Sequence, residues 1–170
     1  IIGIPNHGTL CIGDTLTEGE DLHYQGIPSF APEILCRVRL DDPMRGKNLK
    51  KALEDLSEEG VSQLFKPLTN SNWLVGVVGR LQLDVLVARM EGEYRIKVGF
   101  ESAPYTGARW IYCDDKLELK RFIDQNKGQI AEDLGGCPVY LMNDAWALRF
   151  LQEKWPNIRF KTTREQYVAA

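Results

Sequence analysis

The sequence predicts an α+β fold built around a split β-α-β, ferredoxin-like unit, and two patterns carry this prediction. The first is the order strand, helix, strand, strand, helix, strand over residues 33–101. The second is a change of hydrophobic period after Gly79, where the apolar run 74–78 gives way to apolar residues at helical spacing. We therefore expect a ferredoxin-like part over residues 27–104 and a second small α/β unit over residues 105–170.

Apolar spacing predicts each element of the first unit. Residues 33–40 alternate as in a half-buried strand, which places Arg37 and Arg39 on one face. Gly76 interrupts an apolar run and indicates a close backbone approach or a bulge, whereas Gly79 lies where the chain turns into a helix. The predicted elements are strands at 33–40, 61–68, 73–78 and 96–101, a helix at 47–59 that ends at Gly60, and a helix from residue 81. On the second helix, the inner stripe is predicted to be Leu83, Val87, Met90 and Tyr94. The residues predicted to point to solvent are Asp84, Arg89 and Glu93.

The second unit is predicted from shorter signals. We expect strands at 109–113, 139–142 and 158–161, a helix from about 115 to 134 whose apolar stripe includes Leu119, Phe122, Ile123 and Ile130, and a helix at 144–154. Gly135 and Gly136 are predicted to end the first of these helices. The sequence contains no internal repeat, and this unit either extends the first sheet or packs beside it.

Composition bounds the class of protein. The chain has 170 residues and 44% hydrophobic content, enough for one good core or two small ones. Its net charge is -3, so any contact with RNA depends on a local basic patch. There is no apolar run of about 18 residues and no signal peptide pattern, so we expect a soluble cytoplasmic protein without membrane contact.

Cysteine, histidine and tryptophan positions argue against a metal site and against exposed stacking surfaces. No C-x-x-C pair occurs, so we expect no metal ligation and reduced, buried thiols. Tryptophans at strand and helix positions are expected in the core rather than stacked on bases. The residues concerned are Cys11, Cys36, Cys113, Cys137, His7, His23, Trp73, Trp110, Trp146 and Trp155.

Two segments imitate guanine-nucleotide motifs without their full spelling. Asn126-Lys127-Gly128-Gln129 has glutamine where an acid would read guanine, and Asp133-Leu134-Gly135-Gly136 follows it in the wrong order. The turn at 76–79 could offer backbone amides to a phosphate but lacks Gly-Lys-Ser or Gly-Lys-Thr, so its glycines are interpreted as packing residues. Neither a nucleophile elbow nor a distinctive acid pair occurs. We therefore predict no catalytic residue, no cofactor and no enzymatic activity for this chain.

Local basic residues and one proline-rich segment are the candidate functional features. Arg37, Arg39, Lys47 and Arg109 are candidate RNA contacts, although each is also an ordinary solvated charge in the simpler interpretation. Pro28 and Pro32 favour extended backbone, which predicts a linker over residues 26–32 and a domain boundary there.

Several motifs, in order along nearly the whole chain, also resemble a known family. They are Asn6-His7-Gly8-Thr9, Ile12-Gly13-Asp14-Thr15, Gly26-Ile27-Pro28, Phe30-Ala31-Pro32-Glu33, Leu56-Ser57-Glu58-Glu59-Gly60, Gly76-Val77-Val78-Gly79, Leu81-Gln82-Leu83-Asp84-Val85, Val87-Ala88-Arg89, Glu93-Tyr94, Ala108-Arg109-Trp110 and Thr163-Arg164-Glu165. In these motifs the sequence resembles the C-terminal part of the peptide chain release factor 3 family, bacterial translational GTPases related to elongation factor G.

The resemblance implies a place in a larger protein. It implies that residues 1–26 are the terminal strands of a truncated β-barrel domain and that residues 27–170 are the C-terminal domain. Because the chain opens at Ile1 without a methionine, we expect a fragment. The resemblance further implies that GTP or GDP with Mg²⁺ binds a GTPase domain outside this sequence.

The family's activity supplies the expected partners. It implies ribosome binding through the small subunit, its RNA and its proteins, an indirect action on class-I release factors, and coupling to the chain's own GTPase domain. Arg37, Arg39, Lys47 and Arg109 would then contact the ribosome, with Pro28 and Pro32 as a hinge.

Two other functions remain open on the sequence alone. One is a stand-alone ferredoxin-like module that binds RNA or protein. The other is a small acyl-phosphate hydrolase in which Arg80 or Arg109 holds an oxyanion.

Overall fold

A computed structural model of the chain describes residues 3–5, 15–22, 28–69 and 72–165. The terminal β-barrel strands expected within residues 1–26 lie mostly outside these ranges, as do Cys11 and both histidines. In the described part of the chain, no helix has the length and apolar character needed to cross a membrane.

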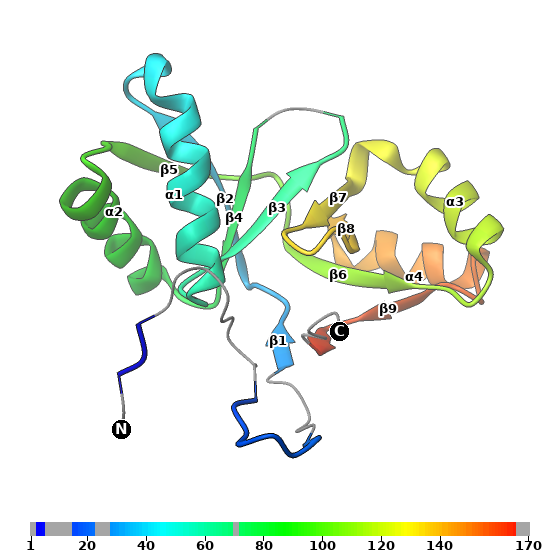
Figure 1. Cartoon of the computed structure of the whole chain (residues 1–170). Helices are drawn as coiled ribbons and strands as arrows, with labels where there is room; N and C mark the ends of the chain where they lie inside the picture. The colour runs from blue at the N-terminus through cyan, green and yellow to red at the C-terminus, as the bar shows by residue number, and fades with distance from the viewer. Residues whose placement is uncertain (1–2, 6–14, 23–27, 70–71, 166–170) are drawn as a thin grey trace.

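The first unit has the predicted order of elements (Figure 1). They are β2 (Ile34–Leu40), the 3₁₀ turn η1 (Pro43–Arg45), α1 (Gly46–Glu58), β3 (Gln63–Pro67), β4 (Leu74–Val77), α2 (Arg80–Tyr94) and β5 (Val98–Ser102). These strands lie in the order β5-β2-β4-β3 with antiparallel pairing throughout. This is the ferredoxin-like arrangement, so the fold prediction is confirmed.

The second unit repeats the first. Its elements are β6 (Gly107–Tyr112), α3 (Lys116–Gln125), the 3₁₀ turn η2 (Lys127–Gln129), β7 (Ile130–Asp133), β8 (Pro138–Met142), α4 (Ala145–Lys154) and β9 (Arg159–Lys161). The strands lie in the order β7-β8-β6-β9, which is the order of the first unit read from its other edge. Pairing of β3 with β7 joins the units into one eight-stranded sheet of the described residues. The extension is therefore a second complete ferredoxin-like unit.

The long helix predicted from residue 115 to 134 is wrong. α3 ends at Gln125, and the Asn126 side chain caps it by donating from Nδ2 to the Phe122 carbonyl oxygen at 2.8 Å. Ile130 then begins β7, whose backbone pairs with β3 and β8. Gly136, at φ +74°, lies in the turn between β7 and β8 instead of at a helix end.

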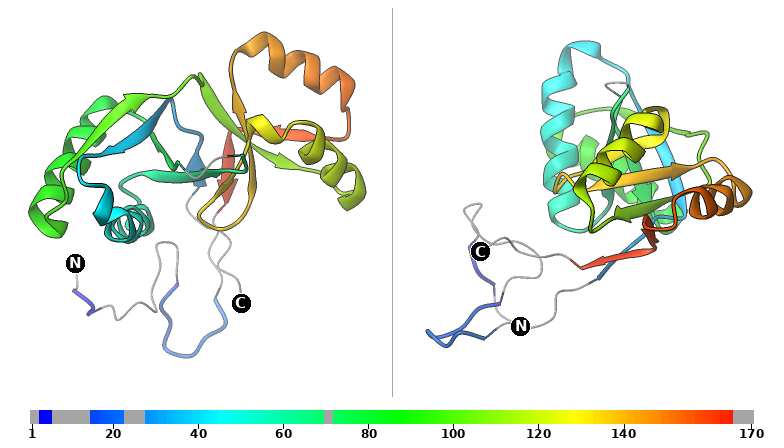
Figure 2. Two further views of the ribbon diagram at one scale, coloured as in Figure 1. Left: turned by 90° about the horizontal axis from the view of Figure 1, so that it is seen from above. Right: turned by 90° about the vertical axis from the view of Figure 1, so that its right-hand side faces the viewer.

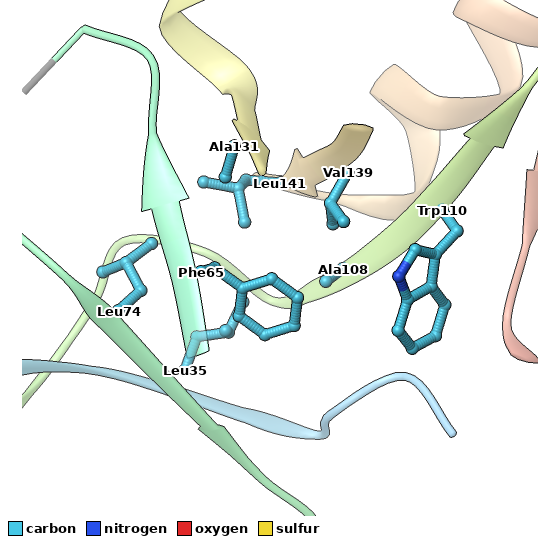
Figure 3. Packing of buried hydrophobic residues seen from close by; sticks show 8 residues of the cluster. All are labelled: Leu35, Phe65, Leu74, Ala108, Trp110, Ala131, Val139 and Leu141. Carbon is cyan, nitrogen blue, oxygen red and sulfur yellow. The ribbon is translucent and has the colours of Figure 1, made fainter. Parts of the chain in front are cut away.

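The helices of both units cover outward faces of the sheet, and the two helix-free faces meet in the middle (Figure 2). We call the buried residues between these faces the central cluster (Figure 3); they are Leu35, Phe65, Leu74, Ala108, Trp110, Ala131, Val139 and Leu141. A separate buried cluster lies under α1 and α2, and another under α3 and α4. Because strand residues alternate between faces, Leu64 packs under the helices while its neighbour Phe65 enters the central cluster.

Three details of the predicted faces need correction. Leu35 shares the face of β2 that carries Arg37 and Arg39, yet it is 3% exposed because the second unit covers that end of β2. Leu86 was not placed in the α2 stripe, yet it is fully buried. Trp146 was expected in the core and is instead 74% exposed, whereas Trp110 is buried as predicted.

Arg89, expected to point to solvent, links the two helices of the first unit. Its guanidinium contacts Glu59 Oε2 at 2.5 Å and Glu93 Oε1 at 2.6 Å, so it joins α2 to the residue that ends α1. The hydrogen bonds that Arg89 donates, first to Glu93 and then to Glu59, raise the pKa of Arg89. The same bond with Arg89 lowers the pKa of Glu93.

A second, two-stranded sheet joins the two ends of the described domain. β1 (Pro28–Phe30) pairs antiparallel with β10 (Thr163–Glu165), and the Ala31 amide donates to the Thr162 carbonyl oxygen at 2.7 Å. The extended backbone predicted for the proline-rich segment is present, but it is held as a strand.

Candidate functional site

A pocket of about 480 Å³ lies where β1 leads into the sheet. Its walls come from the chain between β1 and β2, the end of β4, the start of β6 and the link from β9 to β10. The lining residues are Phe30, Ala31, Pro32, Glu33, Val78, Thr106, Gly107, Arg109 and Thr162. This pocket brings together two predicted features, Arg109 and the hinge proline Pro32.

Pro32 can reach the sheet because β4 carries a glycine. A Cβ atom placed on Gly76 would lie 2.7 Å from Cε2 of Phe65 and 2.7 Å from Cγ of Pro32. The close approach predicted at Gly76 is confirmed, and Pro32 is buried. The segment between Pro28 and Pro32 is therefore anchored at both ends, by strand pairing at Pro28 and by packing at Pro32.

Arg109 is half-buried at the pocket wall. Its Nη1 donates to the neighbouring Ala108 carbonyl oxygen at 2.7 Å, and within the described ranges no carboxylate pairs with it. Thr106 is held by donation from its amide and its hydroxyl to the Met142 carbonyl oxygen, at 2.7 and 3.3 Å. The guanidinium therefore keeps donors for an acceptor that enters the pocket, such as a phosphate or a carboxylate.

The other predicted basic residues lie on two layers of the first unit. Arg37 and Arg39 share an exposed face of β2, as predicted, whereas Lys47 is exposed in the first turn of α1 on the helix side of the sheet. Arg39 lies 3.9 Å from Asp41 and 3.8 Å from Glu101, so part of its charge is compensated. No ion pair within the described residues involves Arg37 or Lys47. The structure thus brings Arg37 and Arg39 together and leaves Lys47 and Arg109 apart from them.

The turn at 76–79 does not hold free amides. The Gln82 side chain accepts from the amides of Val78 at 2.8 Å and Gly79 at 3.2 Å, so the groups that would bind a phosphate cap α2 instead. Gly79 has an ordinary extended φ of -145°, and a Cβ there would touch nothing within 4 Å. Its predicted position before the helix is correct, but the turn does not require a glycine.

Asp133 is a structural centre that the sequence did not indicate. It accepts from Trp110 Nε1 at 2.9 Å and from the Cys137 amide at 2.9 Å, and it pairs with the Arg164 guanidinium. Only 9% of its side chain is exposed, and 20% of that of Arg164. Because Arg164 lies in β10, this ion pair fastens the β1–β10 sheet to the second unit.

Residues in the nucleotide-like motifs thus have structural partners. Asn126 caps α3, Lys127 pairs with Asp124 at 3.0 Å, and Asp133 joins three elements. The only sequence signal for the Asp133 centre was that Trp110 and Arg164 both lie in segments that carry the family resemblance.

The described cysteines all have free thiols. Cys36 is buried, while Cys113 and Cys137 are half-buried and thus less enclosed than predicted. Burial raises the pKa of the Cys36 and Cys137 thiols, so both are held in the protonated, poorly nucleophilic form. Among the described residues, no group of three or more histidine, cysteine, aspartate or glutamate side chains is placed to hold a metal ion.

Comparison with known families agrees with this architecture. The family model of the class II release factor RF3 C-terminal domain matches residues 24–152, which is more than half of the chain. The match includes all of the first unit and the second unit through most of α4. The chain therefore belongs to the class II release factor RF3 C-terminal domain family.

Proposed function

We propose that this chain docks a release factor on the ribosome and transmits a domain movement, without hydrolysing GTP itself. Membership of the family places its role in translation termination, as a non-catalytic C-terminal domain of a release factor. The observation that carries the docking and coupling proposal is the continuity of the fold. Two ferredoxin-like units share one sheet and one central cluster, so they would move as one block.

The hinge in this proposal is the segment from Pro28 to Pro32. Pro32 is packed against Gly76, whereas Pro28 is held only through the β1–β10 pairing. Bending at this segment would therefore strain or open the β1–β10 sheet, beside which the Ala31 amide donates to the Thr162 carbonyl oxygen. The Arg109 pocket is lined by this same segment, so an occupant of the pocket would restrain the hinge.

The docking surface in this proposal uses exposed cations. Arg37 and Lys47 are exposed without an ion pair in the described part of the chain, and Arg109 keeps free donors in its pocket. Arg39 contributes less because Asp41 and Glu101 lie close to it. Because these cations lie on different parts of the block, each would contact RNA phosphates separately.

The remaining assignments follow from the same proposal. The partners are the small ribosomal subunit with its RNA and proteins, and class-I release factors are affected indirectly. GTP or GDP with Mg²⁺ would act in a GTPase domain elsewhere in the whole protein. Action on ribosomes implies a cytoplasmic location. The described chain offers no phosphate loop for that chemistry, since Gln82 occupies the amides before α2.

Co-sedimentation with 70S ribosomes and isolated 30S subunits over a salt titration tests this proposal. We expect saturable pelleting that weakens with salt, and a further loss on charge reversal in Arg37→Glu, Lys47→Glu or Arg109→Glu. Arg121→Glu, an exposed change on α3, is the matched control and should pellet as the unchanged chain does. Absence of pelleting at low salt, with circular dichroism showing a folded chain, would overturn the docking proposal.

A further inference from the structure

Two aromatic side chains lie uncovered on the outer surface of α4. Trp146 is 74% exposed and Phe150 is 53% exposed. Their rings stack on one another, with centroids 6.0 Å apart and planes 14° from parallel. Figure 2 places α4 at the outer edge of the molecule. An exposed pair of this size is the kind of side chain that dominates protein interfaces.

The first unit also exposes apolar side chains at the positions of α2 that correspond to Trp146 and Phe150, so chance is a poor explanation for the exposed pair on α4. Trp146 and Phe150 are the second and sixth residues of α4, and the second and sixth residues of α2 are Leu81 and Val85. Leu81 is 74% exposed and Val85 42%, so both units present apolar side chains outward at equivalent positions. The inward positions are equivalent too, because the seventh residue of each helix, Leu86 or Leu151, is buried.

The charged residue beside the exposed apolar pair is basic on α4 and acidic on α2. Arg149 is the fifth residue of α4 and lies between Trp146 and Phe150, whereas α2 has Asp84 at this position. No described acid pairs with Arg149. A surface that covered both aromatic rings would also remove water from Arg149, and a cation buried without a partner is strongly unfavourable. The covering surface must therefore supply an anion at this point.

The charge around the pair favours a protein over RNA. Glu153 is exposed one turn further along α4, and Asp144 caps its first turn, where the carboxylate accepts from the Ala147 amide at 2.7 Å. These two acids balance Arg149 and Lys154, so the helix surface has no excess positive charge to attract phosphates. A carboxylate beside an apolar groove satisfies both the arginine and the aromatic rings.

We propose that Trp146, Arg149 and Phe150 form a docking site for a ribosomal protein that presents an apolar groove beside a carboxylate. The inference rests on the proposed ribosome docking and adds a second contact, separate from Arg37, Lys47 and Arg109. The aromatic pair would fill the groove, and Arg149 would pair with the carboxylate at its rim.

Site-specific photocrosslinking on 70S ribosomes tests this docking site. Trp146 is replaced by the photoreactive p-benzoylphenylalanine, and the chain is bound to ribosomes and irradiated. Digestion with ribonuclease or protease then shows whether each crosslinked product contains RNA or protein. We expect a crosslink to one ribosomal protein that Arg149→Glu reduces about tenfold and Arg149→Lys largely preserves. The same replacement of Leu117, which is 68% exposed on α3, is the control position and should give no such product.

Each other outcome overturns the docking site in a recognisable way. A product sensitive to ribonuclease would assign the pair to RNA, and a product made of two copies of this chain would indicate pairing of the α4 surface with the Asp84 surface of α2. Pelleting with no crosslink above the Leu117 control would remove the site and leave ribosome docking intact. Failure of the unsubstituted chain to pellet with ribosomes would remove both proposals.

Discussion

The two ferredoxin-like units have the same strand order, yet they differ at one equivalent position. This difference explains where the segment before β2 packs against the sheet. Val77 pairs with the first residue of β2, and Met142 pairs with the first residue of β6. Gly76 and Leu141, one residue earlier, are therefore equivalent, and both face the central cluster. Leu141 fills its side of the cluster with its own side chain, whereas Gly76 leaves room for Pro32.

This difference shows how a repeated architecture acquires an asymmetric role. At this position the second unit supplies a side chain of its own, Leu141, to the central cluster. The first unit lacks one side chain and receives the proline of the incoming segment in its place. A missing side chain in a buried strand can thus fix where a hinge segment is anchored.

The largest expected effect is at that glycine. We expect Gly76→Ala to lower the free energy of unfolding by about 2–3 kcal/mol, because the new Cβ would overlap Phe65 and Pro32. Urea unfolding followed by circular dichroism measures it. Gly92→Ala on α2 is the control, since nothing lies within 4 Å of its Cβ position, and it should raise stability by up to ~1 kcal/mol. Equal stability of the two variants would show that Pro32 does not depend on the missing side chain.

The next effect contrasts a buried aspartate–arginine pair with an exposed one. We expect Asp133→Asn to lower the free energy of unfolding by about 2 kcal/mol, because Arg164 is left without its anion in a largely enclosed site. Asp114→Asn, at a residue 91% exposed and paired with Arg159 at 2.6 Å, should cost less than about 1 kcal/mol. Similar costs in thermal unfolding would mean that Asp133 does not fasten β10.

A smaller effect concerns the pH response of the first unit. Because the bond with Arg89 lowers the pKa of Glu93, the ionised carboxylate stabilises the fold at neutral pH. This contribution is lost as the pH falls through the lowered pKa. NMR titration should find the pKa of Glu93 below its ordinary value and restored toward it in Arg89→Gln. Lys97→Gln, which removes the neighbouring pair with Glu91 at 3.8 Å, should leave the titration of Glu93 unchanged.

The smallest effect is expected on the outer surface of α4. Trp146→Ser should change the free energy of unfolding by at most about 0.5 kcal/mol, since the ring loses only its stack with Phe150. Trp110→Phe, which removes the indole donor to Asp133, should cost more in the same measurement. If Trp146→Ser were the more damaging change, the α4 pair would belong to the fold and not to a docking surface.

Local patterns predicted the first unit almost completely. The alternation in β2, the stripe of α1 and the left-handed Gly60 after it, at φ +75°, each depend on neighbouring residues only. In the second unit, Ile130 continued the helical spacing of α3 by coincidence, and this concealed β7. With the helix ended at Asn126, the same order of elements would have been visible twice.

The candidate site depended on contacts that no local pattern carries. Asp133 lies 23 residues from Trp110 and 31 from Arg164, so nothing in its own neighbourhood indicated the cluster. Arg109 was identified as a candidate, but its position beside Pro32 required the fold. Trp146 is different, because the helical spacing of Leu148 and Leu151 within the predicted helix at 144–154 leaves Trp146 on the outside. The general preference of tryptophan for cores does not hold at this position.

The pairing of β1 with β10 also sets an order of events in folding. Pro28 lies opposite Glu165, so this contact closes a loop that contains nearly every described residue of both units. Contacts with such high sequence separation form late, after the loop between them has become compact. During synthesis, β1 must wait for β10 to leave the ribosome, although Pro32 can pack as soon as β4 is made. The segment proposed as the hinge is thus the last part of the domain to be secured.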